Sequence, residues 1–276
     1  MDDQIVTIYC LCDDFLQAIG HQEDRQCQMN DAEVMTTAIV ASQFFSGNYE
    51  SARGLLKQPQ YIPDMLSKSR FCRRLHRTKG LFLPLFCFLG EVWKELSTDS
   101  VYIIDTFPIP VCDNYRIPRA KIYQSETYRG YIASKKRYFY GLKIHIMVTK
   151  DGQPVEFFLT PGSIADVTGL QLFDFDLPEG AEVYADKAYN DYTIEDVLKE
   201  AGINLLPIRK KNSKRKPPPW LAYLQSRYRK IVETAGSLIE QKLPKSIHAV
   251  TATGFELKVA LFVLGLSLSH LLKVAT

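Results

Sequence analysis

The sequence changes character near residue 100, from a helical first part to a part in which strand and helix patterns follow one another. Residues 1–100 contain no apolar–polar alternation of the strand type. From Val101 onward, short runs rich in β-branched and aromatic residues predict strands, and amphipathic segments between them predict helices. The predicted order is three strands, then helix, strand, helix, strand and helix. This order constrains the fold most, because a strand hairpin followed by alternating units favours one mixed sheet with helices on both faces.

The predicted elements define a fold class and two regions. Strands are expected at residues 101–105, 138–149, 155–160, 182–186 and 203–208, and helices at residues 165–175, 191–202 and 221–241. The fold class is α/β, a mixed sheet flanked by helices and preceded by an all-α N-terminal region. At about 150 residues per domain, the length of 276 residues suggests one large domain or two modest ones. We expect a helical region at residues 1–99 and the sheet domain at residues 100–276.

The N-terminal region predicts two short helices within residues 31–56. Asp31 is the expected N-cap, and the break between the helices falls at Ser46-Gly47-Asn48. Helix-turn-helix domains and plain helical hairpins share this outline, so the pattern does not separate them.

A further helical segment, residues 68–82, is strongly basic. It places four arginines on one helical face: Arg70, Arg73, Arg74 and Arg77. A solvated surface and a phosphate-contacting helix both account for such a face, and the sequence leaves the two open.

Charge is divided unevenly between the two parts. The chain has 34 basic and 31 acidic residues, of which residues 1–100 hold 10 and 13, leaving 24 and 18 for residues 101–276. The net charge is therefore −3 in the first part and +6 in the second. The later part is the better candidate for binding a polyanion.

The cysteines and the apolar segments exclude several other classes of protein. Six cysteines, all within the first 112 residues, show no paired CxxC spacing, so neither a zinc site nor a redox motif is predicted. The acidic N-terminus does not fit a signal peptide. The longest apolar stretch, 14 residues between Lys258 and Lys273, is shorter than the ~20 that span a bilayer and predicts a buried C-terminal helix. We expect a cytoplasmic protein with no membrane partner.

Three carboxylates are candidates for chemistry. Asp105 and Asp186 each end a predicted strand, and ligands of such sheets bind beyond the carboxyl ends of the strands. Each of them, taken alone, is also accounted for as a turn or helix-cap residue. Glu233 lies off the buried stripe of the last predicted helix and shares a face with Arg229, four residues earlier.

Two stretches of the later part are basic and nearly free of acids. Between Glu200 and Glu233 every charged residue is basic: Arg209, Lys210, Lys211, Lys214, Arg215, Lys216, Arg227, Arg229 and Lys230. The second stretch, residues 116–150, includes Lys136 and Lys143, carries one acid and is interleaved with tyrosines. Cations set among aromatic side chains suit phosphate contact together with stacking on bases. A surface loop without a binding role remains an alternative for residues 209–216.

Five segments of the later part follow one another over roughly residues 100–270: IIDTFPIPVC, YGLKIHIMVTKDGQPVEFFLTPGSIADVTGL, VYADKAYND, LLPIRKK and YRKIVETAGSLIEQ. Together they resemble the catalytic domain of bacterial insertion-sequence transposases of the Asp-Asp-Glu (DDE) type. The resemblance implies a ribonuclease H-like fold for the sheet domain. It also gives the helical N-terminal region the role of DNA binding or dimerisation.

The resemblance assigns three catalytic acids. The first aspartate of the family falls on Asp105, and the second, followed by Ala188 and Tyr189, falls on Asp186. The glutamate of the family, preceded four residues earlier by an arginine, falls on Glu233. Asp166 is interpreted as a helix cap or an outer acid rather than a metal ligand.

The same resemblance implies the cofactor and the reaction. Three carboxylates without imidazole or thiolate suit hard divalent cations, here two Mg²⁺ ions for which Mn²⁺ can substitute. Asp105 would bridge both ions, Asp186 would hold one and Glu233 the other. Two such ions serve in-line phosphoryl transfer, so water would free a 3′-hydroxyl at the end of the element and that hydroxyl would attack target DNA.

The implied partners are the terminal inverted repeats of the element and the target DNA, bound by a homodimer in the cytoplasm, at the nucleoid of a prokaryote. The residues predicted to bind DNA are Arg209, Lys210, Lys211, Lys214, Arg215, Arg229, Lys143 and Lys136. Two positions depart from the family pattern, because Ser226 and Glu240 stand where relatives often have tyrosine and lysine.

Two other functions remain as alternatives. One is a ribonuclease H-like nuclease that hydrolyses nucleic acid without strand transfer. The other is a catalytically silent DNA-binding relative, although all three acids are present in their matching contexts.

Overall fold

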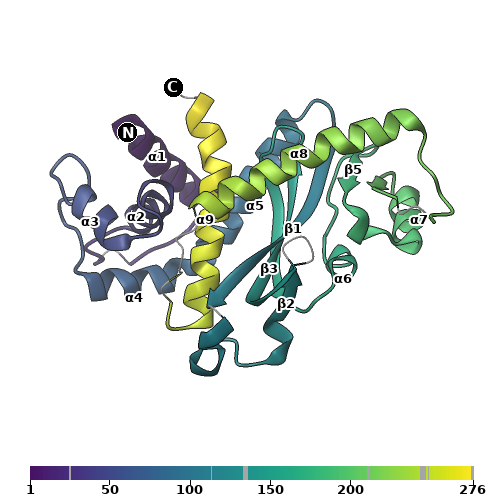
Figure 1. The fold of residues 1–276 in the computed structure, drawn as a ribbon. Coiled ribbons are helices and arrows are strands. Elements are labelled where there is room, and N and C mark those ends of the chain that lie inside the picture. Colours follow the sequence, from purple (N-terminus) through teal and green to yellow (C-terminus); the bar gives the residue numbers. More distant parts are fainter. Residues whose placement is uncertain are drawn as a thin grey trace. The chain divides into compact units, whose positions relative to one another are not determined.

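The computed structural model describes residues 1–24, 26–112, 114–132, 136–209, 212–242, 247 and 249–274 (Figure 1). The chain forms two compact units. The first unit comprises Met1–Phe88 and Ile239–Thr276, and the second comprises Leu89–Leu238. The residues after Leu238, which the sequence analysis kept with the sheet, thus group with the N-terminal helices.

The first unit is helical, as predicted. Its helices are α1 (Asp2–Ala18), α2 (Asp31–Phe44), α3 (Tyr49–Leu56), α4 (Lys68–Thr78) and α9 (Ala252–Val274), with a short 3₁₀ turn at Lys79–Leu81 before α5 (Phe82–Leu96), and α5 continues into the second unit. Most of α2 is buried, which makes it the central helix of this unit. The predicted break between α2 and α3 is confirmed.

The start of α2 differs from the prediction. The N-cap is Asn30, whose side chain accepts a hydrogen bond from the backbone N–H of Glu33 at 2.7 Å. The Glu33 carboxylate in turn accepts from the Asn30 N–H at 2.8 Å, which completes a capping box. Asp31 is therefore the first helical residue instead of the cap, and its side chain is buried.

The predicted buried C-terminal helix is α9. In the described part of the chain it alone is long and apolar enough to cross a membrane, yet 67% of its most apolar stretch is buried within the protein. It packs against α2. The Phe262 ring lies 3.0 Å from the position that a Cβ atom on Gly47 would take, so the α2–α3 turn needs glycine there for space as well as for its φ of +76°. These contacts make α9 a core helix of the first unit.

The second unit is built on the predicted mixed sheet. Its strands are β1 (Val101–Cys112), β2 (Arg129–Ile132), β3 (Arg137–Thr149), β4 (Pro154–Pro161), β5 (Glu182–Ala185) and β6 (Asn204–Pro207). The order is β2-β3-β1-β5-β6, with β4 also paired to β3. β3 runs antiparallel to β1, β2 and β4, whereas β5 is parallel to both β1 and β6.

Strands β4, β5 and β6 are followed in turn by the helices α6 (Asp166–Leu170), α7 (Tyr192–Glu200) and α8 (Pro219–Lys242), and α8 ends in the first unit. Short 3₁₀ helices occur at Asn114–Arg119, Glu126–Tyr128 and Lys187–Tyr189. Strand β2 was not predicted, and α6 is shorter than the predicted helix at residues 165–175.

The prediction that Asp105 ends its strand is wrong, because β1 continues to Cys112. On the β5 side, pairing stops at Ile104, so the rest of β1 is an edge on that side. Pro108 and Pro110 lie in this edge segment. Because no strand pairs with β1 on that side here, the N–H groups that these prolines lack cost no hydrogen bond between strands.

Helices cover both faces of the sheet, as predicted. On one face the Tyr228 ring of α8 packs on Tyr184 of β5, with ring centroids 4.5 Å apart, and Figure 1 shows α8 passing over the strands. Asp105 belongs to this face, because Tyr184 pairs with Ile103 and side chains alternate along a strand. On the opposite face α6 packs against the His145 ring through Gly169.

We predict that Phe262→Ala lowers the free energy of unfolding by about 3–5 kcal/mol, because the side chain is 1% exposed and its loss leaves a cavity. Urea denaturation measures this change. Val250→Ala is the control: Val250 is 86% exposed, so its loss should change stability by less than about 0.5 kcal/mol. Equal midpoints for the Phe262 variant and the wild type would contradict the role of α9 as a core helix.

Candidate functional site

Asp105 and Asp186 are brought together by the pairing of their strands. The parallel register aligns Ile103 with Tyr184 and Ile104 with Ala185. Asp105 follows Ile104 and Asp186 follows Ala185, at the point where β5 ends and β1 continues. The carboxyl ends of parallel strands are where such sheets bind ligands.

Both aspartates line one small pocket. The other lining residues are Ile103, Ile104, Tyr184, Ala185, Ile208 and Gln225. Its free volume is about 10 Å³, close to what a single water molecule needs. Oδ1 of Asp105 accepts a hydrogen bond from the N–H of Thr106 at 2.8 Å, which orients the carboxylate. Oδ1 of Asp186 is buried.

Helix α8 is anchored beside this pocket by Gln225. This side chain is 4% exposed, and its Nε2 donates to the carbonyl oxygens of Leu206 and Pro207 at 3.1 Å each. These contacts fix α8 to the end of β6. Glu233 lies further along the same helix and is exposed.

The structure does not bring the three predicted acids into one cluster. Among the described residues, no group of three His, Cys, Asp or Glu side chains lies close enough to hold a metal ion. Asp105 and Asp186 line the pocket, and Glu233 does not. Its role as the third ligand stays a prediction, and the side chain of Arg229 lies outside the described part of the structure.

A buried polar network supports Asp105 from the opposite face of the sheet. Oγ1 of Thr106 bonds to Nδ1 of His145 at 3.0 Å and to the hydroxyl of Tyr189, and Nε2 of His145 bonds to Oγ1 of Thr160 at 2.9 Å. Burial, followed by the nearby Asp105 carboxylate, raises the pKa of Tyr189 well above its usual value. Tyr189 therefore stays protonated and ties the turn after Asp186 to β1.

His145 is neutral within this network. Burial lowers its pKa to about 4, and the nearby Asp166 carboxylate offsets only part of that shift. Its ring stacks on Phe158, with centroids 4.8 Å apart. A Cβ atom on Gly169 would lie 2.2 Å from the ring, so α6 can approach this closely only with glycine at that position.

Lys143 and Asp166 form an ion pair on the same face. Nζ of Lys143 lies 2.9 Å from Oδ1 of Asp166 and donates to the carbonyl of Ile164 at 2.8 Å. Asp166 is the first residue of α6, where a negative charge is favourable. In this structure Lys143, predicted to bind DNA, holds the start of α6 in place.

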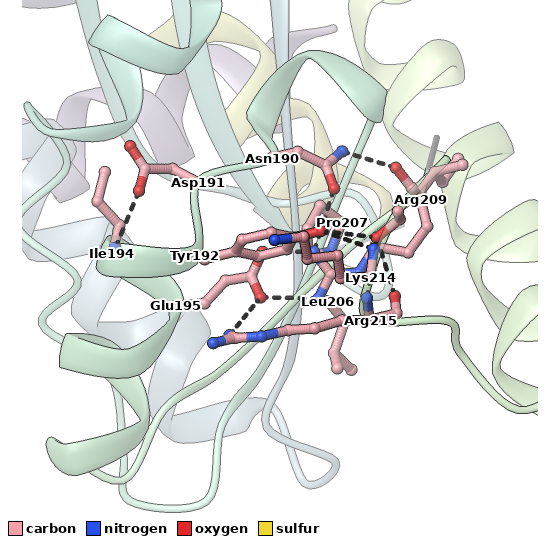
Figure 2. Close-up of polar contacts among 12 residues, drawn as sticks. Asn190, Asp191, Tyr192, Ile194, Glu195, Leu206, Pro207, Arg209, Lys214 and Arg215 are labelled. Atoms are coloured by element: carbon pink, nitrogen blue, oxygen red, sulfur yellow. Dashed lines mark hydrogen bonds and ion pairs between the residues drawn. The ribbon is translucent and has the colours of Figure 1, made fainter. Parts of the chain in front are cut away.

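Arg209 is also engaged within the protein. Its guanidinium forms two hydrogen bonds to the buried carboxylate of Glu195 in α7, at 2.5 and 2.7 Å, and a third to the side chain of Asn190 at 3.1 Å (Figure 2). Glu195 is 6% exposed. A paired arginine of this kind compensates the burial of the carboxylate.

Arg215 makes a second, more exposed pair with the same helix. It contacts both carboxylate oxygens of Asp196, at 2.8 and 2.9 Å, and its guanidinium lies 4.6 Å from the centroid of the Tyr192 ring. The same guanidinium also lies 3.3 Å from a carboxylate oxygen of Glu195 (Figure 2). Lys214, on the same segment, is exposed, as is Lys136 after β2. Lys210 and Lys211 lie outside the described residues.

Sequence reasoning missed the exposed face of α8. Two large aromatic side chains, Trp220 (62% exposed) and Tyr223 (69%), lie on this face with Arg227 and Lys230, which are also exposed. Their spacing of three and four residues puts them on one side of the helix. The signal was present in the sequence as aromatic residues off the buried stripe.

Comparison with known proteins gives the family. Residues 95–248, just over half of the chain, match the family described as "Transposase DDE domain". The chain belongs to the DDE transposase family. No curated protein matches it. Among solved structures, a cryo-EM structure of the piggyBac transposase synaptic complex with hairpin DNA is similar, at 9% identity and a TM-score of 0.45, over 100% of this chain and 74% of that chain.

We predict that Arg209→Ala lowers the free energy of unfolding by about 3 kcal/mol, because it leaves the Glu195 carboxylate buried without its main cation. The double variant Arg209→Ala/Glu195→Gln should recover part of this loss, since the buried charge is then gone as well. Lys214→Ala, at an exposed position on the same segment, is the control and should leave stability unchanged. Urea denaturation decides, and an Arg209→Ala protein as stable as the wild type contradicts the structural role.

We predict that stability falls in acid because of His145. The unfolded histidine, with a pKa near 6.5, takes up a proton between about pH 6.5 and 4, whereas the native side chain, with a pKa of about 4, does not. The contribution is complete above pH ~6.5 and is lost toward pH ~4, to a total of about 3 kcal/mol. Unfolding free energies at pH 7, 6 and 5 test this, and a His145→Gln variant with the same pH slope as the wild type would refute it.

Proposed function

We propose that this DDE transposase cleaves the ends of an insertion sequence and joins the freed 3′-hydroxyls to target DNA. The observation that carries the proposal is the strand register that places Asp105 beside Asp186, in a chain that belongs to this family. Two carboxylates held in place by adjacent strands give phosphoryl transfer a rigid set of metal ligands.

The sheet topology supports a ribonuclease H-like fold for the catalytic unit. On one side of β1 the sheet continues through the antiparallel strands β3 and β4. On the other side of β1 it continues through the parallel strands β5 and β6. In this arrangement β1 is central and carries the first aspartate. The second aspartate follows the strand next to it.

The donor set of the pocket fits a hard divalent cation. Asp105 and Asp186 supply carboxylate oxygens, and no thiolate or imidazole lines the pocket. We assign Mg²⁺ to this site, with two ions held by Asp105, Asp186 and Glu233, and with Mn²⁺ as a substitute. When bound, such ions activate the attacking oxygen and stabilise the leaving one.

The protein itself positions the carboxylates and the DNA. Asp105 is held by the backbone of β1, and Tyr189 fixes the turn that carries Asp186. Arg209 and Arg215 attach both ends of their segment to α7, so the exposed Lys214 is presented from a fixed support. Lys214, with Lys136 and the exposed face of α8, offers cations and aromatic rings to DNA.

The proposed partners are the terminal inverted repeats of the element and the target DNA. Pairing of two ends calls for at least two catalytic units, so we propose a homodimer in the synaptic complex. The site of action is the cytoplasm, at the nucleoid.

We predict that Asp186→Asn reduces Mg²⁺-dependent cleavage by about 10³-fold or more, because several kcal/mol of stabilisation are lost with the carboxylate charge. The substrate is a supercoiled plasmid carrying the genomic DNA that flanks the coding sequence on both sides. Affinity for the same DNA should change little. Asp176→Asn, the same substitution at a side chain that is 86% exposed, is the matched control and should leave cleavage intact.

Two outcomes would change the assignment. Full cleavage by the Asp186 variant would remove this residue from the site. Cleavage by the wild type without joining of 3′-hydroxyl ends to a second plasmid would identify a nuclease, and DNA binding without any cleavage would identify a silent relative.

A further inference from the structure

Helix α4 is a basic segment in an otherwise acidic part of the chain. Residues 65–90 contain no aspartate or glutamate. Six of the ten basic residues in residues 1–100 lie between residues 68 and 79, although these hundred residues carry a net charge of −3. A surface that needed only solubility would mix charges of both signs.

The arginines of α4 divide into one that faces inward and three that face outward. Phe71, Leu75 and Thr78 form the buried side of the helix. Arg74 is on the inner side, with 14% of its side chain exposed. The other three, Arg70, Arg73 and Arg77, are exposed and recur at intervals of three and four residues.

Arg74 forms ion pairs with the carboxylates near α4. It lies 3.0 Å from Asp31 and 3.5 Å from Glu23, and it donates to the carbonyl of Met29 at 3.2 Å. These contacts attach α4 to the start of α2. Within the described part of the chain, none of the three outward arginines forms an ion pair.

The outward arginines border a pocket of about 220 Å³ in the first unit. Its walls are completed by Cys27, Gln28, Met29, Leu66 and Arg74, and no carboxylate is among its lining residues. The pocket thus combines a concave shape, a set of guanidinium groups and the absence of acids, which together favour an anion that is partly enclosed by the protein.

We propose that Arg70, Arg73 and Arg77 bind the phosphate backbone of duplex DNA, which makes α4 a DNA-contacting element of the first unit. The inference rests on the proposed function, which supplies DNA as the partner. From Arg70 to Arg77 the helix rises about 10.5 Å, at 1.5 Å per residue. One DNA strand presents a phosphate every ~3.4 Å of the duplex axis, so along the axis this span equals about three intervals between successive phosphates. The planar guanidinium is well suited to phosphate oxygens.

The test is the salt dependence of affinity for a labelled duplex of about 30 base pairs. Each lost phosphate contact reduces the slope of log K against log salt by about 0.9, so Arg70→Gln/Arg77→Gln should flatten it by about 1.8. Between 50 and 200 mM salt the wild type should then lose about 12-fold more affinity than this variant.

The control removes the same charge elsewhere. Lys57→Gln/Lys199→Gln removes two exposed lysines, one directly after α3 and one in α7, and should leave the slope within about 0.3 of the wild type. Arg70→Lys/Arg77→Lys keeps the charge and should keep most of the slope. Unchanged unfolding midpoints for the three double variants show that their folded state is intact. Arg74→Gln, in contrast, should lower the midpoint, because Arg74 holds the start of α2 through Asp31.

An unchanged slope in the Arg70/Arg77 double variant, or an equal loss in the lysine control, overturns the role of α4. Failure of the proposed function looks different. A wild type that binds the duplex through α4 but does not cleave plasmid DNA refutes the transposition chemistry and leaves the α4 contact standing.

Discussion

The second unit depends on the parallel pairing of β1 with β5. This pairing ends at Ile104 and Ala185, and the residue that follows each of them is one of the two aspartates proposed to be catalytic, Asp105 and Asp186. Because aspartate has a short side chain, backbone register fixes where its carboxylate lies to within a small range. The two anchors around the pocket act on the same elements: Tyr189 binds the turn after β5 to Thr106 of β1, and Gln225 binds α8 to the end of β6. The position of the acids is thus a property of the sheet.

The opposite face of the sheet supplies the rigidity that this arrangement needs. His145 is wholly buried, and both of its ring nitrogens meet threonine hydroxyls. A neutral imidazole satisfies these partners without placing a buried positive charge beside Lys143, whereas a charged one would incur the cost of desolvation. A fully satisfied polar network specifies one arrangement of side chains. Thr106 belongs to this network, and its backbone N–H donates to the Asp105 carboxylate. The network therefore helps to hold this carboxylate in one position.

The sequence predicted the elements whose patterns are local and missed the features that depend on distant residues. Apolar runs rich in β-formers identified five of the six strands in the described residues, but β2 is a short, half-exposed edge strand and has no such run. The helix predicted at residues 165–175 ends at Leu170 because Phe173 packs against the His145 ring and Phe175 packs against Phe173, in an irregular segment with a φ of +51° at Phe175. The end of β1 was misplaced because a proline in an edge segment is compatible with a strand. Whether Glu233 joins the other acids depends on where α8 lies over the sheet, which no local pattern encodes.

The two basic regions show why a count of charges does not identify a binding surface. In the sequence, residues 209–230 are an unbroken basic run, yet two of its arginines meet Glu195 and Asp196, which precede the run on α7. Those acids neutralise two of the cations of the run in space, although none of the acids lies within the run along the chain. In the described part of the structure, Arg74 is the one arginine of α4 that pairs with carboxylates, and these belong to Glu23, before α2, and to Asp31, at its start. What remains on each element after this internal pairing is the charge that acts on a polyanion, because a cation already held by a carboxylate releases few counterions on binding. By that criterion the cations available to a polyanion are the three outward arginines of α4 and, in the second unit, the exposed Lys214, Arg227 and Lys230.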